Sequence, residues 1–360
     1  MASPIVGTAP VGSPPHETQI QNPAIMVIGS LNADLVTYAP RMPVAGETLA
    51  ANGFRTGLGG KGANQAVACA KLGRRSPANR GVNATAAAAP ARAVAAVYMV
   101  GAVGDDVYGR KMTSALSSVG VDTSGVVVRA GQGTGIAVIL VDDAAGGENR
   151  ILLSAEANAT LQPQDYATSL PLTPEDCLPS LLLLQLEIPL STVLQVLQTA
   201  RRQGVPVLLN AAPAEHLPDD AYACITHLVV NETEASLLSG ATLDLDAAAD
   251  RRDSELARVA GHFLQLGVQH VVITLGGAGV YHASASTHTD SGLVPAAQTT
   301  VVDTTAAGDT FIGAYALGLV QGKTVAAAVA WANRAAAVAV GRQGAQESIP
   351  WMDEVKDADA

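Results

Sequence analysis

Short apolar runs of strand length recur along this chain, and each is followed by small or polar residues and then by a helical pattern. The runs occupy residues 24–30, 97–103, 181–186, 205–210, 227–230 and 271–275. A run that is apolar at nearly every position is typical of a strand buried on both faces, as in a parallel sheet. Strands that alternate with helices of about 10–15 residues indicate an α/β fold, in which helices cover both faces of a mostly parallel sheet.

Polar residues stand at the ends of these runs. They are Asn32 and Asp34 after the first run, and later Glu187, Asn210, Asn231, Glu234 and Thr274. Each of them alone would suit a helix cap or a turn. Because the carboxyl ends of parallel strands meet at one edge of a sheet, where open α/β sheets bind their ligands, their shared position favours a binding site.

A compact turn connects residues 299–302, a β-branched run that we expect to form a strand, to a helical pattern. The small side chains of Ala306, Ala307 and Gly308 leave backbone N–H groups uncovered, and unpaired N–H groups at a helix start attract anions. Asp309 would repel a bound phosphate unless its carboxylate has a task, such as accepting a proton from an attacking hydroxyl. The alternative is an ordinary helix cap followed by a first-turn acid.

Residues 57–62 form a glycine loop that matches the dinucleotide fingerprint GxGxxG. That fingerprint belongs in the first strand-turn-helix unit, with an acidic residue about 20 positions later. Here another strand precedes the loop, and the corresponding region 75–96 is not acidic. The motif of a phosphate-binding P-loop does not match either, because Gly62 follows Lys61 where that motif has Ser or Thr. What remains is a loop that brings backbone close to a ligand together with Lys61 and Asn64, or a flexible loop with a solvated lysine.

The composition argues against several classes of function. The net charge of −11 disfavours nucleic acid or an anionic membrane as a partner. The 3 cysteines are widely spaced and no HExxH pair occurs, so a metal bound by side-chain nitrogen or sulfur is not indicated. No apolar run reaches the ~18 residues that cross a bilayer. The N-terminal segment lacks the features of a signal peptide, so the cytoplasm is the expected location and the nucleus stays open as an alternative.

The length of the chain allows one large domain. We expect a disordered tail over residues 1–23, an α/β domain over residues 24–353 and a short tail over residues 354–360. Residues 43–56 alternate in polarity at strand spacing and predict a small antiparallel excursion, a candidate lid. Residues 74–96 predict a surface insertion, which a fold tolerates because each doubling of a loop costs only about 0.6 kcal/mol.

Taken together, these motifs resemble the PfkB family of carbohydrate kinases, and within it the ribokinase branch. The segments GSLNADLV, GGKGANQAVA, NETEA, TLGGAGV, DTTAAGDTF and GAQESIPW occur in the family's order and at compatible spacings. The resemblance implies a three-layer α/β/α fold with a mostly parallel central sheet and a small β lid, whose strands fall within about 34–58 and 132–155. It further implies MgATP-dependent phosphorylation of a sugar, D-ribose at O5 in the ribokinase branch, and a homodimer formed through the lid.

The resemblance also implies roles for individual residues. Asp309 would be the general base, and Ala306, Ala307 and Gly308 would cradle the transferred phosphoryl group. Residues that hold sugar hydroxyls would be Asn32, Asp34, Gly60, Lys61, Asn64, Glu187 and Asp309. Nucleotide-binding positions match Asn231, Thr274, Gly276, Gly279 and Asn333. A potassium site would comprise Asp303, Thr305, Ala339, Arg342, Gly344 and Ser348, and Glu234 would act on magnesium through water.

The chain departs from the family pattern at four positions. Ala45, Ala211 and Val230 replace prolines, which loosens turns without removing a ligand. Glu156 replaces a glycine, so its carboxylate either disturbs a phosphate or sugar site or is held in solvent by its loop. Three alternative functions stay open: a family kinase for a nucleoside or hexose, a non-catalytic sugar sensor, and an NAD-dependent oxidoreductase that rests on residues 57–62 alone.

Overall fold

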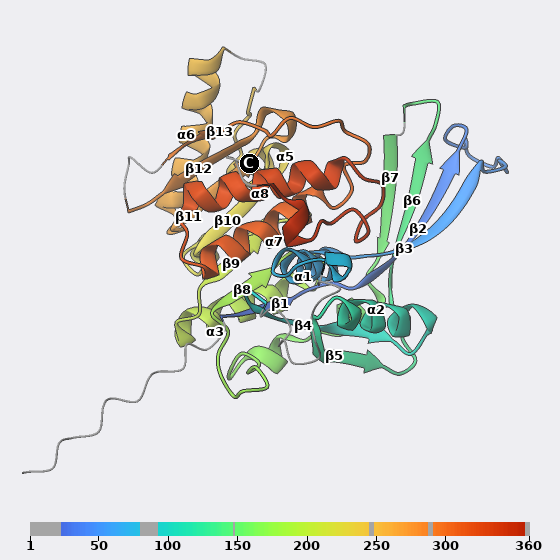
Figure 1. The fold of residues 1–360 in the computed structure, drawn as a ribbon, viewed down its shortest axis with the longest axis horizontal. Coiled ribbons are helices and arrows are strands. Elements are labelled where there is room, and N and C mark those ends of the chain that lie inside the picture. Colours follow the sequence, from blue (N-terminus) through green and yellow to red (C-terminus); the bar gives the residue numbers. More distant parts are fainter. Residues whose placement is uncertain (1–22, 80–92, 147, 245–247, 287–290, 357–360) are drawn as a thin grey trace, which may run out of the picture.

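The apolar runs form the central sheet of the protein (Figure 1). The computed structural model describes residues 23–79, 93–146, 148–244, 248–286 and 291–356. Within these residues the sheet has the order β13-β12-β11-β10-β9-β8-β1-β4-β5. Its strands are β1 (Ala24–Ile28), β4 (Ala96–Gly104), β5 (Asp122–Arg129), β8 (Leu181–Leu184), β9 (Val207–Asn210), β10 (His227–Asn231), β11 (His270–Thr274), β12 (Val280–Ser284) and β13 (Ser291–Val294). The pairs β11-β12 and β12-β13 are antiparallel and the other pairs are parallel, which confirms the predicted mostly parallel sheet.

Helices cover both faces of this sheet (Figure 1). One layer holds α1 (Lys61–Leu72), α2 (Val107–Ser118), α7 (Ala307–Val320) and α8 (Val325–Val340), and the other holds α3 (Leu190–Gln203), α4 (Asp219–Tyr222), α5 (Glu232–Ser239) and α6 (Ala249–Gln265). Because alternate residues of a strand point to opposite faces, Ile25 and Val27 of β1 pack into the first core, while Met26 and Ile28 pack into the second. The predicted three-layer α/β/α fold is confirmed.

Short 3₁₀ segments complete the connections. They are η1 (Pro77–Asn79), η2 (Glu156–Thr160), η3 (Pro163–Tyr166), η4 (Gly276–Ala278) and η5 (Met352–Glu354). Two residues that the prediction places in the C-terminal tail pack onto the domain: Glu354 accepts a hydrogen bond from the Arg342 guanidinium at 2.9 Å, and Val355 is buried. The predicted tail over residues 1–23 and the insertion over residues 74–96 lie largely outside the described residues.

A second, smaller sheet projects beside the central layers (Figure 1). Its order is β3-β2-β6-β7, formed by β2 (Asn32–Ala39), β3 (Gly53–Gly59), β6 (Gly135–Asp142) and β7 (Glu148–Ser154). The β2-β6 pair is parallel, and the pairs β2-β3 and β6-β7 are antiparallel. Every residue of β7 is exposed. The predicted smaller sheet is therefore confirmed, and we refer to it as the small sheet.

The strand predicted over residues 299–302 is wrong. This segment belongs to no strand, and Val301 and Val302 are 62% and 60% exposed. The N–H groups of Val302 and Asp303 donate to the Val340 carbonyl at 2.7 and 3.2 Å instead. Its β-branched residues favour an extended backbone, but the neighbouring partner is the end of α8 rather than another strand. In the part of the chain that the structure describes, no helix is both long enough and apolar enough to cross a membrane.

Candidate functional site

The candidate site lies at the carboxyl edge of the central sheet, next to the neighbouring strands β1 and β8. From β1 the sheet extends on one side through β4 and β5, and on the other side through β8 to β13. Such a reversal of strand order opens a crevice in which α/β sheets bind ligands. The segments that follow β1 and β8 are therefore well placed to meet a substrate, and we call this region the crevice.

The carboxylate of Glu187 accepts hydrogen bonds from residues of different segments in the crevice. Its Oε2 atom accepts hydrogen bonds from the Ser30 hydroxyl at 2.6 Å, the Lys61 backbone N–H at 3.0 Å and the Asn32 amide at 3.4 Å. Asn32 is held from its other side, because the Asn158 amide donates to its Oδ1 atom at 2.8 Å. Three residues that the sequence predicts as sugar ligands thus lie together.

The glycine loop before α1 packs closely against the end of β1. Gly60 has a φ of +86°, and a Cβ built on it would lie 2.7 Å from the backbone nitrogen of Asn32. A Cβ on Gly62 would lie 2.6 Å from the backbone nitrogen of Ser30. Only glycine fits these two positions, so the loop places the first turn of α1 directly over the crevice.

Asp34 lies in β2 near several other carboxylates. Burial raises the pKa of its carboxyl group to about 7, and the negative charges of Glu187, Glu347 and Asp309 act in the same direction. The guanidinium of Arg55 on β3 opposes this shift. Asp34 therefore titrates close to neutral pH and can offer either a donor or an acceptor to a polar ligand.

Lys61 brings a positive charge into the crevice. Burial works against this charge, but the carboxylates of Asp309, Glu187 and Glu234 outweigh it and raise the pKa of the ammonium group. The lysine therefore stays protonated at neutral pH. Its charge interacts with the three carboxylates, which come from α7, from the segment after β8 and from α5.

Asp309 lies in the first turn of α7 and is 8% exposed. Each of its carboxylate oxygens accepts one amide hydrogen bond, Oδ2 from Asn64 and Oδ1 from Gln65, both at 3.0 Å. Asn64 is itself buried, and its Oδ1 atom has no hydrogen-bond partner among the described residues. An unpaired acceptor beside the carboxylate is available to a ligand hydroxyl.

The start of α7 leaves backbone donors uncovered. Ala306 precedes the helix with a φ of +58°, and no side chain within the described residues caps the helix. A Cβ built on Gly308 would meet open space rather than the rest of the described chain. The first N–H groups of a helix lack helical partners and carry the positive end of the helix dipole. An anion bound there would lie beside Asp309.

Asn231 and Glu234 lie farther along the same edge, at the start of α5. The Asn231 side chain accepts from the Glu234 N–H, and the Glu234 carboxylate accepts from the Asn231 N–H, both at 2.8 Å. This reciprocal pair is a capping box, the structural alternative for such a sequence. Burial raises the pKa of Glu234, although the Asn231 N–H and the Lys61 charge oppose the shift. Glu234 therefore also faces the crevice.

Thr274, Gly276 and Gly279 follow β11 in the turn that leads to β12. Gly279 has a φ of +105°, and a Cβ on it would lie 2.1 Å from a carbonyl oxygen of β13. Asn333 of α8 donates from its side chain to the Pro295 carbonyl just after β13, at 2.6 Å. Gly279 and Asn333 thus border the same loop, and the Asn333 amide already holds that loop in place.

Asp303 joins the turn before α7 to the loop after α8. Its Oδ1 atom accepts from the Thr305 N–H and its Oδ2 atom from the Gly344 N–H, both at 2.9 Å. Burial opposes the charge of Asp303, but these hydrogen bonds and the Arg55 charge lower its pKa. Because Nη2 of Arg55 lies 3.9 Å from Oδ2 of Asp303, the small sheet is linked to this turn.

The other residues predicted for a monovalent cation border this junction. The Ala339 carbonyl accepts from the Arg342 N–H at 2.9 Å. The Ser348 hydroxyl is fully buried and donates to the Ala345 carbonyl at 2.8 Å. The Arg342 guanidinium binds Glu354. Because a guanidinium has no acceptor atom, only the backbone carbonyl of this residue could bind a cation. A set of carboxylate, carbonyl and hydroxyl oxygens suits a hard cation.

Glu156 has a φ of +48°, in the region that favours glycine, which accounts for the glycine that the family pattern has at this position. Its side chain is exposed to solvent. The next polar residue of the loop, Asn158, is buried and still donates to Asn32. The hydrogen bond that supports Asn32 is thus present despite the glutamate.

Gln65, Gln185 and Arg55 are residues of the crevice to which the sequence analysis assigns no role, although Gln65 lies within the segment GGKGANQAVA. Gln65 directly follows Asn64, and neighbouring helix residues point about 100° apart. A prediction that Asn64 points into the crevice therefore does not imply that Gln65 contacts the same carboxylate. Gln185 interrupts the apolar run 181–186. A glutamine inside a buried strand run is itself a signal, because a buried amide requires hydrogen-bond partners.

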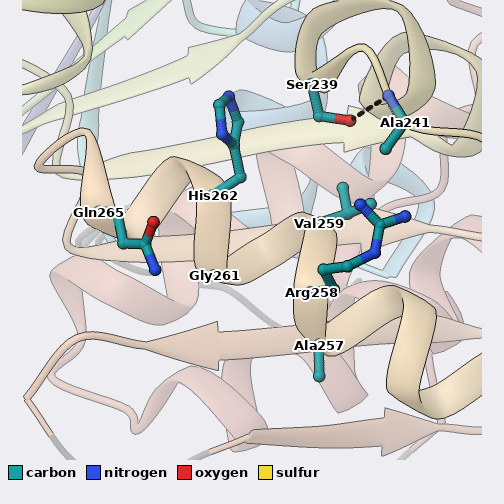
Figure 2. A pocket seen from close by; sticks show the side chains of 8 residues that line it. All are labelled: Ser239, Ala241, Ala257, Arg258, Val259, Gly261, His262 and Gln265. Carbon is teal, nitrogen blue, oxygen red and sulfur yellow. Dashed lines mark hydrogen bonds between the residues drawn. The ribbon is translucent and has the colours of Figure 1, made fainter.

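A cavity of about 400 Å³ opens beside Asn32 and Glu187, between β7 and the segment after β8. Another hollow, of about 430 Å³, lies between the end of α5 and α6. Figure 2 shows its side chains, among them Arg258, His262 and Gln265 on the same helix. None of the residues that line this second hollow belongs to the crevice, so the first cavity is the one that adjoins the candidate site.

The chain is similar to known proteins over most of its length. A model of the pfkB family of carbohydrate kinases matches residues 22–352. The chain is 40% identical to a ribokinase of Schizosaccharomyces pombe over 334 residues, which cover 92% of this chain and 96% of the relative. It is 35% identical over 337 residues to a deoxyribokinase of Salmonella typhi, with 92% and 97% covered. A solved structure of Arabidopsis thaliana ribokinase, complexed with ribose and ATP, matches with a TM-score of 0.75 at 29% identity and covers 93% of this chain and 98% of that chain. The chain therefore belongs to the PfkB family of carbohydrate kinases.

Proposed function

We propose that the protein transfers the γ-phosphoryl group of ATP to O5 of D-ribose, which yields ribose 5-phosphate and ADP. The observation that carries this proposal is the Asp309 carboxylate in the first turn of α7, beside uncapped backbone donors and bonded to Asn64. The similar ribokinases of Schizosaccharomyces pombe and Arabidopsis thaliana, the latter complexed with ribose and ATP, support the same reaction. Such a site acts by positioning its substrates and by neutralising charge.

Asp309 is the general base in this proposal. O5 of the sugar attacks the γ-phosphorus, its proton passes to a carboxylate oxygen of Asp309, and the bond between the γ-phosphorus and the ADP oxygen breaks. In a loose transition state the proton leaves late, so a strong base is not required. The N–H groups of Ala306, Ala307 and Gly308 receive the transferred phosphoryl oxygens. In the free protein the Ala307 N–H donates to the Thr304 carbonyl at 3.2 Å, so this donor exchanges its partner on binding.

The sugar hydroxyls bind the residues that surround the glycine loop and the Glu187 carboxylate. These residues are Asn32, Asp34, Gly60, Lys61, Asn64, Glu187 and Asp309. Two of them are prepared for a hydroxyl: the Oδ1 atom of Asn64 has no partner among the described residues, and Asp34 titrates near neutral pH. A ligand with several hydroxyl groups satisfies both.

The nucleotide lies along the other half of the carboxyl edge. Its contacts are Asn231, Thr274, Gly276, Gly279 and Asn333. A Cβ on Gly276 would meet open space, so the turn after β11 leaves room for a ligand. Magnesium is assigned to Glu234 through water, since a partly buried carboxylate supplies the oxygen that this hard cation prefers. When bound, it would neutralise phosphate charge.

A potassium ion fits at the junction between the turn before α7 and the loop after α8. The residues assigned to it are Asp303, Thr305, Ala339, Arg342, Gly344 and Ser348. When bound, it would stiffen the turn that presents the phosphoryl donors. Activity should rise when potassium replaces sodium. An equal rate with either ion would contradict the assignment.

Two copies of the chain associate through the small sheet. Its edge strand β7 exposes three consecutive apolar residues, Ile151, Leu152 and Leu153, with exposed fractions of 53%, 68% and 49%. Exposed apolar residues on an edge strand invite pairing with another chain, and a second copy would cover them. Sedimentation equilibrium should give the mass of a dimer, and a monomer at all concentrations would oppose this association.

A coupled assay of ADP release tests the proposed reaction with D-ribose, 2-deoxy-D-ribose, D-fructose and adenosine. We expect the highest kcat/KM for D-ribose, and the deoxy sugar is included because of the similar Salmonella protein. Turnover of adenosine without turnover of a pentose would overturn the choice of substrate. Asp309→Asn should lower kcat by roughly 10²–10⁴-fold while ATP still binds. Near-normal turnover in this variant would refute the assigned base.

A further inference from the structure

We infer that Gln185 and Gln65 form a buried chain of side-chain amides that positions the Asp309 carboxylate. This inference rests on the proposed function, because it concerns the orientation of the proposed base. We call Gln185, Gln65 and Asp309 the positioning chain. Its two glutamines are positioning residues, since neither is needed to touch a substrate.

Three hydrogen bonds fix the amide of Gln65. Its Nε2 atom donates to Oδ1 of Asp309 at 3.0 Å and to Oδ1 of Asn210 at 3.1 Å. Its Oε1 atom accepts from Nε2 of Gln185 at 2.6 Å. Both glutamines are 0% exposed. Gln65 thus uses both amide hydrogens and its oxygen within the protein interior, where an unmet hydrogen bond is costly.

The neighbours of Gln65 allow one orientation of its amide. If the amide were reversed, its oxygen would face the oxygens of Asp309 and Asn210, and its nitrogen would face the nitrogen of Gln185. The orientation of Asn210 is set in turn, because its Nδ2 atom donates to the Val229 carbonyl at 3.2 Å. Gln65 therefore presents an N–H group, and never its oxygen, to the carboxylate.

The positioning chain is anchored in the rigid part of the fold. Gln185 directly follows β8 and Asn210 ends β9, and these two neighbouring strands belong to the buried central sheet. Through Gln65, which lies in α1, they hold a carboxylate that α7 carries. A group held by packed strands is oriented more accurately than one held by a loop.

The two amides that bind Asp309 have different surroundings, and this difference assigns a task to each carboxylate oxygen. Asn64 has an oxygen without a partner among the described residues, and in the proposed function this residue contacts the sugar. Gln65 faces the sheet and is fully engaged. The structure thus assigns Oδ1 of Asp309 as the oxygen that is held, and Oδ2 as the oxygen that receives the proton.

Replacing Gln65 by methionine keeps the size of the side chain and removes its donors. A reacting group displaced by about 1 Å can lose about 10²-fold in rate. We expect Gln65→Met to lower kcat by roughly 10–10²-fold, with the KM values for sugar and ATP changed by less than about threefold. Gln185→Met leaves the Gln65 oxygen without its donor, but Asp309 and Asn210 still set the orientation of the amide. It should therefore lower kcat by a smaller factor, with the same KM values.

A double-mutant cycle separates positioning from a general structural role. If Gln65 acts through Asp309, adding Gln65→Met to Asp309→Asn should change the residual single-turnover rate by less than about twofold. A structural role would lower that residual rate by the same factor as in the wild type. Gln203→Met is the matched control, because Oε1 of Gln203 on α3 accepts from the Leu170 N–H at 2.9 Å away from the crevice. It should leave kcat unchanged.

The outcomes distinguish this inference from the proposed function. Wild-type protein that phosphorylates no sugar would defeat the proposed function. An active wild type together with a Gln65→Met variant within about threefold of its kcat would defeat the positioning chain alone. If Gln65→Met does not fold, Gln185→Met decides, and a folded Gln185→Met protein with full kcat overturns the inference.

Discussion

The two sheets of this protein differ in how deeply they are buried. Strands β1, β8 and β10 of the central sheet are buried at nearly every position, whereas β7 of the small sheet is exposed along its whole length. Both sheets contribute to the crevice, the central sheet through Glu187 and Gln185, and the small sheet through Asn32 and Asp34. The crevice therefore has one wall in the core and one wall at the base of a sheet whose edge strand β7 is exposed.

The contacts that join the small sheet to the turn before α7 are of a weak kind. Arg55 lies at ion-pair distance from Asp303, and both side chains are partly exposed. Exposed ion pairs contribute little to stability and are easily broken and remade. We therefore expect the small sheet, rather than the base held by the positioning chain, to be the wall that adjusts to a ligand.

The largest expected effect of this contrast concerns stability. Leu183 of β8 is fully buried, and Leu183→Ala should lower the free energy of unfolding by about 2–5 kcal/mol, because the cavity left behind collapses incompletely. Urea unfolding followed by circular dichroism measures it. The matched variant is Leu152→Ala in β7, where the side chain is 68% exposed in a single copy of the chain. Measured at a protein concentration at which the chain is monomeric, it should change the same quantity by less than about 0.5 kcal/mol. Equal losses in the two variants would contradict the difference between the sheets.

The same contrast explains what the sequence predicts and what it does not. Strands buried on both faces leave continuous apolar runs, so the central sheet and its carboxyl edge follow from the sequence. Residues 299–302 have a strand-like composition but lie against the end of α8. Composition does not specify the element with which a segment pairs. The strand prediction fails there for that reason.

Site residues divide in a similar way. Asn231 ends β10, Glu187 follows β8 closely, and Asn32 begins β2 shortly after β1. The order of strands and turns is enough to predict these positions. The hydrogen bond from Gln65 to Asp309 joins residues 244 positions apart, and that from Gln185 to Gln65 joins residues 120 positions apart. Such pairs depend on which side chains meet across packed elements. No local pattern specifies them.

An intermediate effect is expected for the pH dependence of sugar binding. Asp34 of the small sheet has a pKa of about 7, raised chiefly by burial. If sugar hydroxyls donate to its ionised form, the KM for D-ribose should rise by up to about tenfold for each pH unit below 7 and level off above it. Initial rates measured from pH 5.5 to pH 8.5 check this expectation, and a KM that stays flat over this range would oppose the assignment of Asp34 as a sugar ligand.

Asp34→Asn is the control for this pH dependence. The variant should show a higher KM that no longer changes near pH 7, because the titrating group is gone. The pH dependence of stability is a second readout. The pKa of the Asp34 carboxyl group rises from 3.8 in the unfolded chain to about 7 in the folded protein. Its contribution to stability is therefore fully present below pH 3.8 and is lost as the pH rises through about 7. Relative to the wild type, the unliganded variant should therefore be more stable at pH 8 than at pH 5.

The smallest effect is expected for Arg55→Gln, which removes the ion pair between the small sheet and the turn before α7. Nη2 of Arg55 lies 3.9 Å from Oδ2 of Asp303, with side chains that are 38% and 19% exposed. The free energy of unfolding should change by less than about 1 kcal/mol, and by still less at high salt. Because the Arg55 charge lowers the pKa of Asp34, its loss should move the rise in KM to higher pH.

Arg41→Gln is the matched control for Arg55→Gln, because Arg41 forms an ion pair with Glu47 in the connection between β2 and β3. Removing that pair should leave the pH profile of KM in place, since Arg41 does not contribute to the pKa of Asp34. If Arg55→Gln instead destabilised the protein as much as Leu183→Ala, the small sheet would be tied to the core as firmly as the central strands are to one another. Its role as the adjustable wall of the crevice would then be untenable, and any closure around the sugar would have to come from the loops at the carboxyl edge.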